Sequence, residues 1–295
     1  MTSAGLVADA LFTLRSSDGV TVDTETREIA ERGSVRESLD VLFGIDVASL
    51  PLSGYVSVRA TGASFRGSLL DNPTRGAHAV PGLLATGWAR VAFPFFAIGG
   101  GFTSEVTLVN TDPSNDAGVT VTAFDADGGT IGSPFATVIG PSEREALNLE
   151  TIFGSGSGVT VGRFVLDIQK TAPHPFASVP QLAGMVRVEV SAGAATAGPI
   201  LNYAGNEFYF TPTRSDATEY TGLAVENTGA ASITVTATAY ASNGVVLDTE
   251  DFTVAPSATR SALLRELLSG ALGQDGGFVK LTATANTMNT LALRG

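Results

Sequence analysis

A stretch in which apolar and polar residues alternate occurs three times along this chain. In its clearest form, residues 117–125, small apolar residues alternate with glycine and threonine, which is the period of two expected of a strand with one buried face. Asp127-Gly128 follows and predicts a tight hairpin turn. Similar strands precede the turns at Asp18-Gly19 and Asn243-Gly244. The chain is therefore predicted to be an array of repeated β units.

The turns set the length of the repeat. Their glycines are 109 and 116 residues apart (128 − 19 and 244 − 128), so the 295 residues divide into three units of about one hundred residues. We expect domains over residues 1–90, 91–206 and 207–295. The first lacks the opening strand of the other two, and the second is expected to carry an inserted hairpin or loop over residues 155–183, which contains His174.

Each unit also contains one short segment with helical spacing. These segments read SVRESLDVLFG, SEREALNLETIFG and SATRSALLRELLSG, and Ser34/Glu37 and Ser142/Glu145 are candidate capping boxes in the first two. Their leucines and phenylalanines fall on one face, as expected of a helix that closes the end of a sheet sandwich. The predicted fold class is all-β, with three tandem Ig-like β-sandwiches that each contain one short crossing helix.

The segments between units are aromatic and do not have the composition of flexible linkers. Residues 91–101 read VAFPFFAIGGG and residues 207–212 read EFYFTP. A strand or a packed bridge that stiffens the junction explains them better than a ligand platform, because soluble proteins rarely expose so much contiguous apolar surface.

Several of these motifs together resemble a known kind of repeat. The run FPFFAIGGGFTSEVTLVNTD, then VTAFDADGG, LETIFG and a GMVRVEV strand, is similar to the tandem β-sandwich repeats of large exported, cell-surface bacterial proteins, which follow the pattern FPxFAxGGGxTTxLxLVNP. The resemblance spans essentially the whole chain. It implies an extracellular or cell-surface location, and it supplies no catalytic residues.

Charge and composition narrow the range of partners. The net charge is −12, so nucleic acid and anionic membranes would be repelled. The least polar stretch, residues 78–98, contains Pro81, Arg90 and Pro94 and is unsuited to crossing a membrane. We therefore expect neither nucleic-acid binding nor membrane insertion.

Residues that could support catalysis are sparse. Cysteine is absent, and the two histidines, His78 and His174, lie apart in proline-flanked segments. Asp125 and Asp127 resemble the start of a calcium loop, although the later glutamate of such a loop is missing and a hairpin turn explains them better. We expect no catalytic site, no cofactor and no metal beyond this weak calcium candidate.

The pattern therefore favours a non-enzymatic function. The leading hypothesis is a structural or adhesive module of an extracellular bacterial surface protein or filament, with other copies of itself or neighbouring repeats as partners. The alternative is a carbohydrate- or protein-binding accessory region of a secreted enzyme, in which a glycan is the ligand. Its candidate contact residues are aromatic: Trp88, Tyr203, Phe208 and Tyr209.

The missing opening strand of the first unit has two explanations. The chain is either an excerpt of a longer array, which we favour, or it receives that strand from a neighbouring molecule, as donor-strand fibres do. In both cases the first unit is expected to be the least stable.

Overall fold

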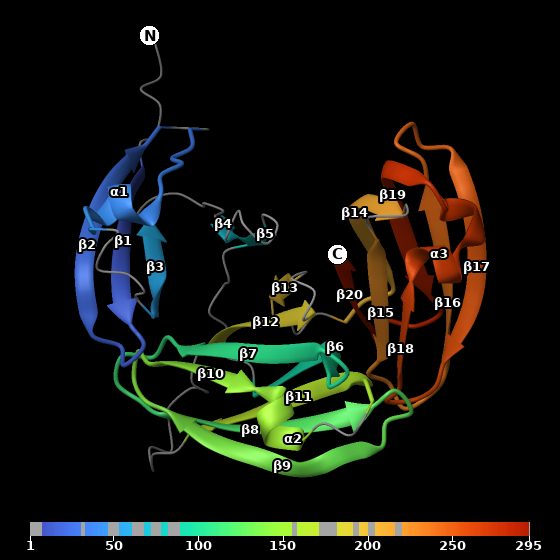
Figure 1. Ribbon diagram of the computed structural model, residues 1–295, viewed down its shortest axis with the longest axis horizontal. Coiled ribbons are helices and arrows are strands. Elements are labelled where there is room, and N and C mark those ends of the chain that lie inside the picture. The colour runs from blue at the N-terminus through green and yellow to red at the C-terminus, as the bar shows by residue number, and fades with distance from the viewer. Residues whose placement is uncertain are drawn as a thin grey trace.

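The computed structural model gives a chain built almost entirely of antiparallel strands, arranged in three parts that follow one another along an open arc (Figure 1). We name these parts the first unit (residues 8–60), the second unit (residues 90–199) and the third unit (residues 207–294). The structure describes residues 8–30, 33–46, 53–60, 68–71, 78–81, 89–154, 158–170, 182–190, 195–199, 204–215 and 220–294.

The second unit consists of two four-stranded sheets that enclose one core. The first sheet has the order β6-β11-β8-β9, formed by Arg90–Ile98, Thr160–Lys170, Ala117–Asp125 and Thr130–Ile139. The second has the order β10-β7-β12-β13, formed by Arg144–Asn148, Phe102–Asn110, Leu182–Val190 and Ala195–Pro199. Phe93 and Phe164 stack in the core with ring centroids 5.4 Å apart.

The third unit repeats this topology, except that its described residues contain no counterpart of β13. One sheet has the order β14-β19-β16-β17, formed by Glu207–Ser215, Gln274–Ala283, Ile233–Tyr240 and Val246–Val254. The other has the order β18-β15-β20, formed by Thr259–Leu263, Thr221–Asn227 and Met288–Arg294. A second buried cluster, which includes Val235, Leu264 and Leu281, lies between these sheets.

In its described part, the first unit retains half of this architecture. Its sheet has the order β2-β1-β3, formed by Thr21–Ile29, Ala8–Ser16 and Gly54–Ala60, and matches β9-β8-β11 of the second unit. Its buried cluster is small and comprises Leu14, Leu42 and Phe43. A separate hairpin pairs β4 (Ser68–Asp71) with β5 (His78–Pro81).

The alternation predicted from the sequence is confirmed in the central strands. Ala117, Val119 and Val121 of β8 are buried while the residues between them are partly exposed, and β16 repeats this pattern. The predicted hairpin glycines Gly19, Gly128 and Gly244 have φ of +81°, +89° and +84°, which is the left-handed region that favours glycine. The chain is all-β, as predicted.

The helices are shorter than predicted and begin later. α1 spans Leu39–Phe43, α2 spans Leu149–Phe153, α3 spans Leu264–Leu267, and a 3₁₀ turn spans Ser269–Ala271. Both predicted capping boxes are wrong. Residues 144–148 are extended because they pair with β7, and Asn148 caps α2 instead. In the first unit Glu37 pairs with Arg27.

The segment expected to be an insertion contains a strand of the shared framework. β11 lies between β6 and β8, in the place that β19 has in the third unit. Strand register makes Gly162 of β11 the counterpart of Gly277 of β19. Residues 171–181, with His174, lie outside the described residues.

Both aromatic connectors form strands. Residues 91–98 belong to β6, which pairs with β11 and contributes Phe93 and Phe96 to the second core. Residues 207–212 belong to β14, which pairs with β19. β6 also runs beside β15, β18 and β20, so it contacts the third unit as well as its own.

Candidate functional site: the joints between units

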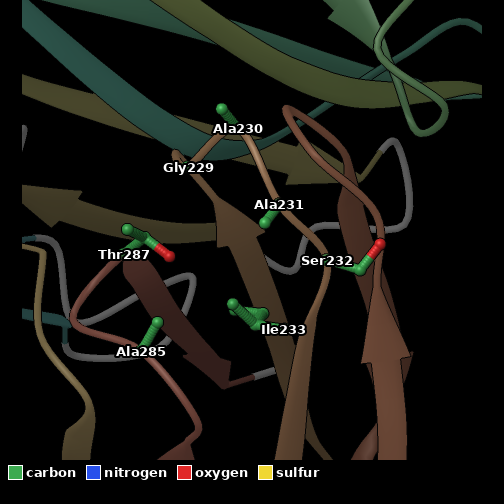
Figure 2. Close-up of a pocket in the computed structure, with 7 residues that line it drawn as sticks. All are labelled: Gly229, Ala230, Ala231, Ser232, Ile233, Ala285 and Thr287. Carbon is green, nitrogen blue, oxygen red and sulfur yellow. The ribbon is translucent and has the colours of Figure 1, made fainter.

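The described residues contain no cluster of side chains suited to metal binding. No group of three or more His, Cys, Asp or Glu side chains lies together among them. Figure 2 shows a surface hollow of the third unit lined by small and apolar residues without a charged side chain: Gly229, Ala230, Ala231, Ser232, Ile233, Ala285 and Thr287. The lining contains the hydroxyls of Ser232 and Thr287 but no His, Asp, Glu, Lys or Cys side chain.

Asp125 serves the hairpin turn. Its carboxylate accepts hydrogen bonds from the backbone N–H groups of Asp127 and Gly129, at 3.0 and 2.7 Å. The backbone N–H of Asp125 also donates to the Gly129 carbonyl oxygen. This geometry is that of an Asp-stabilised turn, which gives the Asp125 carboxylate a structural role.

The candidate contact aromatics have different locations. Trp88 and Tyr203 lie outside the described residues. Phe208 packs against the core of the third unit, whereas the next residue of β14, Tyr209, is 56% exposed. Of the two members that the structure describes, Tyr209 is the exposed one.

Hydrogen bonds connect each unit to the next, and we call these two contact regions the first joint and the second joint. At the first joint, the β1–β2 hairpin contacts the segment between β9 and β10 of the second unit. The Ser17 carbonyl oxygen accepts a hydrogen bond from the Arg144 N–H at 2.8 Å, and the Tyr55 hydroxyl donates to the Ser142 carbonyl oxygen at 2.8 Å. A Cβ on Gly19 would lie only 2.7 Å from that same Ser142 oxygen, so glycine is required for the close approach.

The second joint repeats these three contacts. The β8–β9 hairpin contacts the segment between β17 and β18 of the third unit, where the Ala126 carbonyl oxygen accepts from the Thr259 N–H at 3.0 Å. Arg163 donates through Nη2 to the Ser257 carbonyl oxygen at 2.9 Å. A Cβ on Gly128 would lie 2.9 Å from the Ser257 oxygen.

Strand register shows that the two joints use equivalent positions. Tyr55 pairs across the sheet with Arg15, four residues before Gly19, and Arg163 pairs with Phe124, four residues before Gly128. Ser142 and Ser257 are the only described residues other than glycine with positive φ, at 61° and 54°. Both follow a proline in what we call the Pro-Ser turns, Gly140–Glu143 and Ala255–Ala258.

An asparagine holds each Pro-Ser turn in place. The side-chain amide of Asn110 donates to the carbonyl oxygens of Ile139 and Gly140, at 3.1 and 3.0 Å. Asn227 does the same for Val254 and Ala255, at 3.2 and 3.1 Å. Both asparagines are fully buried. Sequence reasoning missed this role, for which the signal was an Asn-Thr pair at the end of the same strand in two units.

The second joint adds a buried ion pair. Arg163 Nη1 lies 2.9 Å from Glu226 Oε1, and these side chains are 7% and 2% exposed. Asn289 donates to Glu226 Oε2 at 3.1 Å, and the guanidinium of Arg163 lies 4.2 Å from the centre of the Phe124 ring. Burial raises the pKa of Glu226, while the nearby charge of Arg163 opposes that rise.

Comparison with known proteins assigns neither a family nor a function to this chain. No protein family and no curated protein matches the sequence. Among solved structures, a β-glucuronidase of Bacteroides uniformis matches over 64% of this chain and 24% of its own length, with 14% identity and a TM-score of 0.18. An α-L-rhamnosidase from Dictyoglumus thermophilum covers 98% of this chain and 45% of its own length, with 9% identity and a TM-score of 0.20.

A third structure is that of Sulfolobus Turreted Icosahedral Virus, with 11% identity, 100% of this chain and 79% of that chain covered, and a TM-score of 0.15. The chain thus spans less than half the length of both glycosidases. TM-scores this low carry no argument about fold or function. Among the described residues, no helix has the length and hydrophobicity needed to cross a membrane.

Proposed function

We propose that this chain is a non-enzymatic structural or adhesive module of an extracellular bacterial surface protein or filament. The observation that carries the proposal is the repeated joint, in which the same three contacts join successive units at equivalent positions. Contacts that fix one rigid unit against the next suit an array that spans distance. In this proposal the units are three tandem Ig-like sandwiches, each with one crossing helix.

Self-association is the property that tests this function. A structural module should assemble into fibres or ordered oligomers, visible in electron micrographs and as a concentration-dependent species in sedimentation velocity. A panel of glycosides, esters and peptides should give no turnover. The proposal fails if the protein stays monomeric at high concentration and also turns over one of these substrates.

A carbohydrate-binding accessory function is the second candidate, because the third unit presents a row of aromatic rings. Tyr209 is exposed, its ring centroid lies 6.4 Å from that of Phe278, and Phe278 stacks on Tyr240 at 4.5 Å. Flat apolar rings of this kind can pack against the apolar face of a sugar. Saturable binding in a glycan array that is lost in Tyr209→Ala, while Tyr55→Ala retains it, would favour this function over the first.

A further inference from the structure

The third unit presents a buried row of polar side chains to the second unit. Glu226 of β15 pairs across the sheet with Thr259 of β18 on one side and with Asn289 of β20 on the other. All three residues are buried. Asn289 donates to the carbonyl oxygen of Ala92 in the second unit at 3.4 Å, as well as to Glu226. We call Thr259, Glu226 and Asn289 the joint row of the third unit.

The second unit carries an equivalent row with different chemistry. Val109 and Glu226 each directly precede the asparagine that holds a Pro-Ser turn. Val109 pairs across the sheet with Arg144 on one side and with Ala183 on the other. The joint row of the second unit is therefore Arg144, Val109 and Ala183. It contains a cation and two apolar residues, whereas the row of the third unit contains a carboxylate and two neutral polar residues.

The preceding unit supplies a different donor at each joint. Arg163 of the second unit binds the row of the third unit, with Nη1 2.9 Å from Glu226 Oε1. At the equivalent position the first unit has Tyr55, which is neutral. The cation next to it, Arg15, donates through Nη1 to the carbonyl oxygen of Gly19 in its own hairpin at 2.8 Å. The row with a cation is thus used with a neutral donor, and the row with a carboxylate is used with a cation.

Exchange of the two donors would be unfavourable at both joints. A tyrosine in place of Arg163 would leave Glu226 buried without its counter-charge, which is strongly destabilising. An arginine in place of Tyr55 would add a further cation to a joint that already contains Arg144, and like charges across an interface repel. Interfaces become selective through this combination of a matched pair and a repelled alternative.

We propose that the joint rows make the contact between units selective, so that the third unit accepts a β unit with an arginine at the position of Arg163 and rejects one with a tyrosine there. This inference rests on the proposed structural function, since an array has a defined shape only if its units join in one order. The first unit of a second copy is thereby excluded from the place of the second unit. Such exchange of units is a characteristic error of repeat proteins.

A cycle of four proteins tests this selectivity. The native chain has the arginine–glutamate pair at the second joint. Arg163→Tyr and Glu226→Val each mix a residue of one joint with a residue of the other. Arg163→Tyr/Glu226→Val instead installs both residues that occupy these positions in the first joint. Selectivity requires that the native and double variants form the joint and that the two single variants do not.

The arrangement across the second joint is measured with spin labels at Val138→Cys and Val246→Cys, which are exposed positions on β9 and β17 in a chain without cysteine. We expect a narrow distance distribution for the native chain and the double variant, and a broad one for each single variant. In chemical denaturation, Arg163→Tyr should raise the unfolding equilibrium constant by about a hundredfold, because one partner of a buried ion pair is removed. The double variant should lie within about tenfold of the native chain.

Additive losses in the double variant, or single variants with native distances and stability, contradict the inference. If a variant of this cycle does not fold, a milder cycle with Arg163→Gln and Glu226→Gln takes its place, because amide side chains retain hydrogen-bonding groups at both positions. Additive losses in that cycle overturn the inference equally. If sedimentation velocity nevertheless shows concentration-dependent assembly, the proposed structural function survives and only the selectivity of the joint fails.

Discussion

The two joints share the same backbone contacts, which we call the backbone frame. They differ in the side chain that donates a hydrogen bond beside this frame. In both, a hairpin glycine approaches the carbonyl oxygen of a left-handed serine, and a backbone N–H two residues later donates to the hairpin. The first joint is completed by the neutral hydroxyl of the partly exposed Tyr55. The second is completed by Arg163, which is also paired with Glu226 in the protein interior.

This difference separates what positions the units from what sets the strength of their contact. The frame consists of backbone groups and two positive-φ residues, so it depends little on side-chain chemistry. The side-chain donor beside the frame is a tyrosine in the first joint and an arginine in the second. Its contribution to the free energy of unfolding therefore differs between the two joints. An ion pair removed from water is costly to break and gains little over an apolar pair, whereas a hydroxyl bond has a modest net value.

The largest expected loss of stability follows from breaking the ion pair between Arg163 and Glu226. Arg163→Met leaves Glu226 buried without its counter-charge, and we expect it to lower the free energy of unfolding by about 3–5 kcal/mol. Chemical denaturation measures this loss. The double variant Arg163→Met/Glu226→Leu removes both charges and should lose clearly less, so an equal or larger loss in the double variant would contradict a charge-based account.

The glycines of the frame come next. Gly19→Ala and Gly128→Ala each place a Cβ against a carbonyl oxygen of the next unit, and we expect each to cost about 1–3 kcal/mol for overpacking, in addition to backbone strain. Gly244→Ala is the matched control, because it has a similar φ of +84° and open space around the Cβ. Thermal unfolding that is equally affected in all three variants would show that only backbone strain matters.

Tyr55 sharpens the comparison at the weaker joint. Tyr55→Phe removes the hydroxyl that donates to Ser142, and we expect a loss of about 0.5–1.5 kcal/mol in the free energy of unfolding. Tyr209→Phe serves as the control, since the Tyr209 hydroxyl bonds to Glu207 on the surface. Indistinguishable stabilities of these two variants would mean that the Tyr55 bond contributes nothing to the joint.

The smallest expected effect is a dependence on pH at the second joint. Because burial raises the pKa of Glu226 above the ordinary 4.5, the folded protein binds this proton more tightly than the unfolded chain does. The contribution of Glu226 to the free energy of unfolding is therefore fully present below pH 4.5 and is lost as pH rises through the raised pKa.

Glu226→Gln isolates this contribution. The free energy of unfolding of the native chain minus that of Glu226→Gln should decrease as pH rises from about 4.5 to about 7. A difference that increases over this range would show instead that Arg163 holds the pKa of Glu226 below its ordinary value.

Much of the fold could be predicted from local pattern, but little of the site. The strands β8 and β16 could be predicted from the alternation of apolar and polar residues, and the hairpins from Asp-Gly and Asn-Gly. This was possible because strand period and positive φ are properties of short segments. The segment after Ser142 was predicted to be helical because its own spacing allows a helix, while pairing with β7 makes it extended. Long-range pairing of this kind is not visible in a local window.

The joints could not be predicted because they are formed mostly by backbone groups, which no residue pattern distinguishes. Two of the three contacts in each joint use backbone carbonyl oxygens and N–H groups, which every residue possesses. The third uses Tyr55 in one joint and Arg163 in the other, so the equivalent positions share no side-chain chemistry. The recurrent Pro-Ser and Asn-Thr pairs were the available signals, and they acquire meaning only when strand register places them at the same contact.

The central claim is that the joints hold the three units in one fixed arrangement. Spin labels at Val22→Cys and Val246→Cys, two exposed positions on β2 and β17, report the distance between the first and third units across both joints. Double electron–electron resonance should give a single narrow distance distribution in the otherwise native chain, and a broad one when Gly128→Gln is added to disrupt the second joint. A broad or multi-peaked distribution without Gly128→Gln would show that the units move independently and would contradict the account.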